Sequence, residues 1–68
     1  MKLYQFLEVA FYDDKVRIYE RDETGTAINT YDGTVEEVNQ LLPFELKERK
    51  ISFITNLIGA FGIELEDL

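Results

Sequence analysis

Neither cysteine nor histidine occurs in this sequence of 68 residues, so disulfides and zinc, the usual staples of very small folds, are not open to it. A chain of this size buries only about 60% of the surface that its unfolded form exposes. Its stability must therefore come from side-chain packing or from self-association. Apolar residues make up 46% of the chain, with five Phe and four Tyr, which is enough for a packed core. We expect a single domain over residues 1–68, with a homodimer as an alternative to an isolated monomer.

The same two absences remove most catalytic chemistry. Without a thiol or an imidazole, and with Ser52 as the sole serine, the chain cannot assemble a nucleophile with its usual base. The carboxylates fall in predicted turns and on predicted solvent faces, where nothing would raise a pKa toward neutrality. The Asp22–Thr26 stretch gathers oxygen ligands, but its glycine comes too early for an EF-hand loop. We therefore expect no enzyme activity, no catalytic residue, no cofactor and no metal.

Charge limits the choice of partner. Fourteen acids against seven bases give a net charge of −7, which disfavours nucleic acid and anionic membranes as partners and favours a basic protein. No run approaches the roughly 18 apolar residues that a membrane span requires. Gln5 and Glu8 interrupt the apolar start of the chain, so we expect no signal peptide and a cytoplasmic location. Acidity also serves solubility alone, and the sequence does not separate the two roles.

Hydrophobic periodicity predicts the first two thirds of the fold. A helical period of apolar residues comes first, formed by Leu3, Phe6, Leu7, Ala10 and Phe11. The period changes to two over 15–21, and the Asp22–Gly25 turn leads to a second strand over about 26–31. Thr34 and Glu37 then form a capping box before a short helix that Pro43 ends. The apolar stripe of that helix consists of Val35, Val38, Leu41 and Leu42.

The last third of the chain permits two interpretations. Apolar spacing over 46–61 fits a helix, but that helix would hold Gly59 in its interior and several β-branched residues. Strands over 50–56 and 61–67, joined by 57–60, agree better with the alternation at Phe61, Ile63 and Leu65. We therefore predict an α+β fold of order αββαββ, an antiparallel sheet with two short helices on one face, with a helical 46–61 segment as the alternative.

Three stretches of the sequence resemble a known group. Residues 12–20 (YDDKVRIYE), 31–38 (YDGTVEEV) and 49–54 (RKISFI) are together similar to a loose group of short hypothetical proteins of prophages and mobile elements in Gram-positive bacteria. The resemblance implies a mobile-element context and favours a strand over 50–56. The group has no known function, so no binding residue carries over. The 57–60 turn is longer and more apolar than that pattern.

Protein recognition is the function that these limits leave. Tyrosines beside exposed carboxylates suit an interface, because tyrosine buries a large area and keeps a polar tip. We predict a non-catalytic acidic protein-interaction module, a phage or mobile-element accessory protein acting on a basic host surface. The candidate partner-binding residues are Arg17, Tyr19, Arg21, Tyr31, Glu64, Glu66 and Asp67. The alternative is weak nucleic-acid binding by the strand face of Arg17, Tyr19 and Arg21 with the basic run of Lys47, Arg49 and Lys50.

Overall fold

Two hairpins lie side by side and form one four-stranded sheet. A computed structural model describes residues 1–57 and 59–66 of the chain. The strands are β1 (Lys15–Arg21), β2 (Ala27–Thr34), β3 (Ile51–Leu57) and β4 (Ala60–Leu65). Their order across the sheet is β2-β1-β4-β3, so the first strand of one hairpin lies next to the last strand of the other. The α+β class and the approximate order αββαββ are confirmed.

The sheet is mixed, and the prediction of a wholly antiparallel sheet is wrong. Each hairpin is antiparallel, but β1 and β4 run parallel, with Val16 opposite Phe61 and Ile18 opposite Ile63. The helical segment between β2 and β3 is long enough to return the chain across the sheet, so β3 starts in the direction of β2. Its hairpin partner β4 therefore runs with β1. Turn signals fix the direction within a hairpin but not between hairpins.

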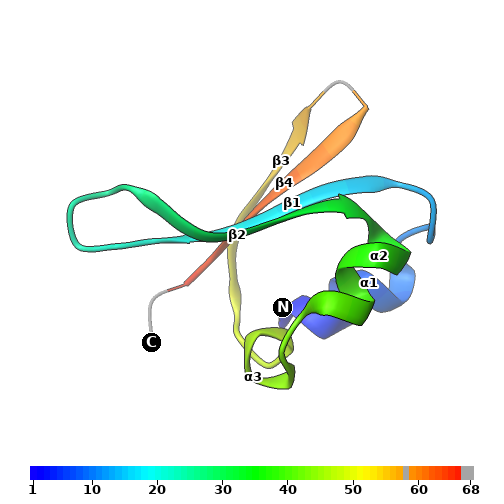
Figure 1. Cartoon of the computed structure of the whole chain (residues 1–68), viewed down its shortest axis with the longest axis horizontal. Coiled ribbons are helices and arrows are strands. Elements are labelled where there is room, and N and C mark those ends of the chain that lie inside the picture. The colour runs from blue at the N-terminus through cyan, green and yellow to red at the C-terminus, as the bar shows by residue number, and fades with distance from the viewer. Residues whose placement is uncertain (58, 67–68) are drawn as a thin grey trace.

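Three helices, one more than predicted, cover one face of this sheet (Figure 1). They are α1 (Leu3–Val9), α2 (Val35–Leu41) and the single turn α3 (Phe44–Lys47). The predicted capping box is present, because the Glu37 N–H donates to Thr34 Oγ1 (3.2 Å) and the Thr34 N–H donates to Glu37 Oε1 (3.1 Å). The Thr34 N–H bond to the Glu37 carboxylate lowers the pKa of Glu37, and the Thr34 side chain beside that carboxylate lowers it further. Pro43 ends α2 and caps α3.

The last third is a hairpin, so the alternative of a helix over 46–61 is wrong, apart from the two residues at the end of α3. Gly59 has a φ of 77°, a backbone conformation that suits a turn and that glycine adopts without cost. Asn56 stands opposite Phe61 and Thr55 opposite Gly62. The β-branched residues that made a helix unfavourable here are suited to strands.

The core lies between the helices and the sheet. Its fully buried side chains are Leu3 from α1, Val38 from α2, Ile18 from β1 and Ile63 from β4. Leu7, Val16, Val35, Leu42 and Leu65 complete it. Two predicted members lie outside it, since Phe11 is 75% exposed and Leu41 is 67% exposed. Phe11 lies beyond the end of α1 at Val9, whereas Leu41 is the last residue of α2 and the core contact passes to Leu42.

Candidate interaction surface

The open face of the sheet, which is the side away from the helices, carries most of the candidate residues. Residues along a strand alternate between the two sides. Val16 and Ile18 enter the core, so Arg17, Tyr19 and Arg21 of β1 lie on the open face. The register adds Asp32 of β2 opposite Arg17 and Glu64 of β4 beside Tyr19.

Arg17 and Asp32 form an ion pair across β1 and β2. The Arg17 Nε donates to Asp32 Oδ1 over 2.7 Å, and both side chains are more than half exposed. The hydrogen bond to Asp32, and then its charge, raise the pKa of Arg17. The guanidinium therefore has a carboxylate of its own chain as a partner.

Arg21, Tyr19 and Glu64 form a second cluster. The Arg21 Nε donates to Glu64 Oε1 over 2.7 Å, and its Nη1 donates to the Gly25 carbonyl. The hydrogen bond to Glu64 is the main reason that the pKa of Arg21 is raised. Its guanidinium carbon lies 5.3 Å from the centre of the Tyr19 ring, within cation–π range. Only 15% of the Glu64 side chain is exposed, so this carboxylate belongs to the face and not to a free acidic tail.

A shallow hollow of about 350 Å³ lies in this face. Gly62, which has no side chain, stands between Arg17 on β1 and Thr55 on β3. The lining residues are Arg17, Tyr19, Arg21, Ala27, Thr30, Thr55 and Gly62. The hollow therefore has basic, aromatic and hydroxyl groups around a bare backbone floor.

The open face also carries Phe53, which sequence reasoning missed. Phe53 stands opposite Glu64 in the β3–β4 pairing, and its side chain is 47% exposed. A register shift between Ile51 and Phe53 decides which side it takes. The sequence shows that Phe53 and Thr55 lie on the opposite side of the strand from Ile54. It does not show which of the two sides faces the helices.

The other candidate residues lie elsewhere. Tyr31 stands opposite Ile18 and packs against the core, so it is on the helix side. Glu66 follows β4, and its N–H donates to the Lys50 carbonyl (2.9 Å). Asp67 lies outside the described residues. The structure thus brings together Arg17, Tyr19, Arg21 and Glu64, and separates Tyr31 from them.

The basic run of Lys47, Arg49 and Lys50 does not join the basic strand face. Arg49 lies on the helix side, where its Nη1 donates to Glu20 Oε1 (3.2 Å) and its Nη2 donates to the Glu66 carbonyl. The Arg49 and Glu20 side chains are only 10% and 18% exposed. Glu20 also accepts from Asn29 Nδ2 (2.8 Å). Arg49 therefore links β1 to the end of β4 through these hydrogen bonds and has a structural role.

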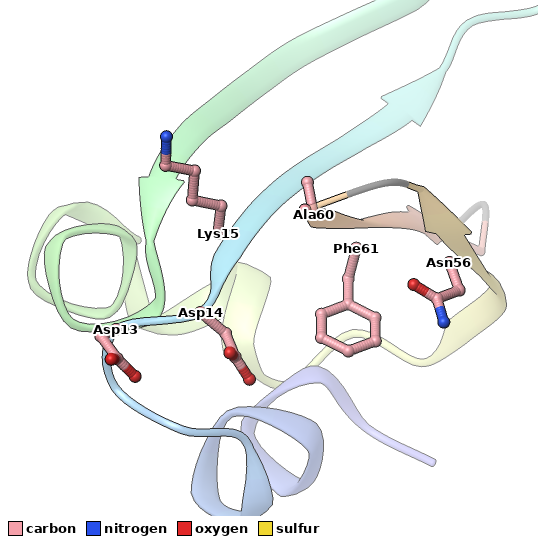
Figure 2. Close-up of a pocket in the computed structure, with 7 residues that line it drawn as sticks. Asp13, Asp14, Lys15, Asn56, Ala60 and Phe61 are labelled. Carbon is pink, nitrogen blue, oxygen red and sulfur yellow. The ribbon is translucent and has the colours of Figure 1, made fainter.

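A second hollow, of about 380 Å³, lies at the end of the sheet near the β3–β4 turn (Figure 2). Asp13, Asp14 and Lys15 line it from the loop before β1 and the start of that strand, and Asn56 and Phe61 line it from the second hairpin. Its charges come mainly from the two aspartates. Within residues 1–57 and 59–66, no three side chains of the metal-binding types come together as a site.

Comparisons with protein-family models, with curated proteins and with solved structures give no match to this chain. In the described part of the chain, no helix is both long and apolar enough to cross a membrane.

Proposed function

We propose that this chain is a non-catalytic protein-interaction module that binds its partner through the open face of the sheet. One observation carries the proposal: Tyr19 and Phe53 flank Glu64 in one row across β1, β4 and β3, on the side that the described helices leave uncovered. Aromatic residues and arginine are the types enriched where proteins meet.

The paired charges of this face support a protein partner over nucleic acid. Cationic side chains bind the phosphates of a nucleic acid and release the counterions that had surrounded them. Arg17 and Arg21 already donate to Asp32 and Glu64 over 2.7 Å, so a phosphate would have to displace a carboxylate at each. A protein surface can pack on the aromatic rings and leave both ion pairs in place.

The net charge supports a basic partner. A charge of −7 attracts a positively charged protein from a distance and speeds their encounter. As part of the same proposal, we place the module in the cytoplasm of a bacterial host, as an accessory protein of a mobile element. The resemblance to mobile-element proteins remains a prediction.

The test is capture from a bacterial lysate with matched variants. The bait is immobilised as the wild type and as the Tyr19→Ala, Phe53→Ala and Tyr12→Ala variants, with folding checked by circular dichroism. Tyr12 is the control because it is an aromatic residue, 68% exposed, that lines the groove between α1 and α2. We expect the wild-type and Tyr12→Ala baits to capture a basic protein that neither open-face variant captures.

A protein set unchanged by both open-face variants would contradict the proposal. A parallel titration with single-stranded DNA at two salt concentrations covers the other class of partner. Tight DNA binding with a steep salt dependence would overturn a protein-binding function in favour of nucleic acid.

A further inference from the structure

Strand β3 leaves its outer edge open. β4 pairs with one side of β3, and β3 is the last strand of the sheet order. Within the described residues, the outer side is covered only at its start. There the Ile51 N–H donates to the Met1 carbonyl (2.8 Å), and the backbones of Lys2 and Lys50 form an isolated antiparallel β-bridge. From Phe53 onward, alternate backbone N–H and C=O groups point outward and can pair with another strand.

From Phe53 onward, this edge also lacks the usual protection against pairing. β3 is the only one of the four strands without a charged residue, and it holds no proline. The opposite edge strand, β2, is interrupted by a bulge at Asn29, where φ is 51°, and carries Asp32. Charges and bulges are the devices by which edge strands avoid association. β2 has both in its middle, whereas the β3 register is regular after Phe53.

Apolar side chains are half exposed on both sides of this edge. Ile54 stands opposite Ile63 on the helix side, yet 41% of it is exposed, and Phe53 on the open face is 47% exposed. The second hairpin extends beyond the helices in Figure 1, so they do not cover the far part of β3. A strand added at this edge would bury Ile54 and cover the outer flank of Phe53, whose ring stays on the open face.

The charges at the two ends of β3 favour a second copy of the chain, in antiparallel orientation. Lys2 and Lys50 lie at the start of the strand, with Glu48 paired to Lys2. Asp13 and Asp14 line the hollow at the other end beside Asn56, together with Lys15. Glu48 offsets Lys2, so the start of β3 keeps the charge of Lys50. Lys15 offsets one aspartate, so the far end keeps one negative charge, and antiparallel pairing of two copies brings these opposite charges toward each other. The neutral middle lets two chains of net charge −7 approach.

We propose that two copies of this chain pair through β3 about a two-fold axis at Ile54, which joins their sheets into one of eight strands. Ile54 then lies against Ile54 of the other copy on the helix side, and Phe53 lies across from Thr55 of the other copy on the open face. Both sets are uncharged cross-strand pairs. The two-fold axis is perpendicular to the sheet, so the two open faces point the same way. The dimer does not rest on the proposed function, although Phe53 borders both surfaces, and it would make the open face bivalent.

The test uses opposite charges at the axis. Sedimentation is measured over roughly 5–500 µM, because a single strand pair is a small interface of expected micromolar affinity. Ile54→Lys and Ile54→Glu should each weaken self-association at least about tenfold, since like charges stand directly opposite each other. Mixing the two variants should restore a dimer. Ile28→Lys is the matched control, on the other edge strand and 37% exposed, and should associate as the wild type does.

Cysteine cross-linking gives an independent reading that needs no charged variant. The chain has no cysteine, so Ile54→Cys introduces a single thiol. Directly opposite residues of an antiparallel pair have Cα atoms about 4.5–5.5 Å apart, which a disulfide can bridge. We expect rapid oxidation of Ile54→Cys to a covalent dimer, and slow oxidation of Ile28→Cys. A wild type that is monomeric at every concentration, or equal oxidation of the two variants, would overturn the proposal.

Discussion

Arg49→Ala tests whether the basic run holds the fold together or serves binding. The variant removes a guanidinium that is 10% exposed, together with its bonds to Glu20 and to the Glu66 carbonyl. A hydrogen bond to a charged group contributes about 1.5–3 kcal/mol. Glu20 is 18% exposed and keeps its bond from Asn29, so the full cost of a buried unpaired charge does not arise. We expect Arg49→Ala to lower the free energy of unfolding by about 2 kcal/mol.

That loss is large for this chain, because stabilities of about 0.05–0.15 kcal/mol per residue give roughly 3–10 kcal/mol in total. Urea unfolding followed by far-UV circular dichroism measures it. Lys50→Ala is the control, because Lys50 is exposed and its carbonyl bond to the Glu66 N–H survives the change. We expect it to stay within about 0.5 kcal/mol of the wild type. Equal changes in the free energy of unfolding for the two variants would refute the structural role of Arg49.

Four further predictions concern stability. Thr34→Ala removes the α2 cap and should cost about 1 kcal/mol in urea unfolding. The lowered pKa of Glu37 means that its bond stabilises the fold fully above the ordinary glutamate pKa of about 4.3 and is lost as the pH falls through the lower folded-state value. Glu37→Gln should therefore lower stability at pH 7, and its gap from the wild type should shrink as the pH falls below the ordinary glutamate pKa; a gap that stays constant on acidification would contradict this. Gly59→Ala should cost about 1 kcal/mol because φ is 77°, whereas Gly59→Asn should cost less; stabilisation by alanine would speak against the turn. Ile63→Val should cost about 1 kcal/mol in the same assay, since Ile63 is fully buried, and a neutral result would place it outside the core.

Much of the secondary structure followed from local chemistry. The strand at 15–21 was visible because its period is two, and the start of α2 because Thr34 and Glu37 are three residues apart. The parallel contact between β1 and β4 was not predictable, because it depends on where the 16-residue segment between β2 and β3 places the start of β3. α3 is a single turn, too short for a periodic signal.

The candidate surface was predictable in part. Arg17, Tyr19 and Arg21 had to share one side of a strand. Their carboxylate partners Asp32 and Glu64 depend on register, which no local pattern fixes. Tyr31 is a clear case: it was predicted as a partner-binding residue, but the pairing with Ile18 turns it toward the helices. Arg49 was likewise grouped with its sequence neighbours, although its contacts lie on β1 and after β4.

Photo-crosslinking in bacterial cells tests whether the open face of the sheet binds a protein. A photoreactive phenylalanine analogue replaces Tyr19 in one variant, Phe53 in a second and Tyr12 in a third, so that two positions report on the open face and one on the groove between α1 and α2. We expect a light-dependent adduct with one partner protein from positions 19 and 53, and none from position 12. Adducts from position 12 alone, adducts with nucleic acid, or no adduct from either open-face position would contradict it.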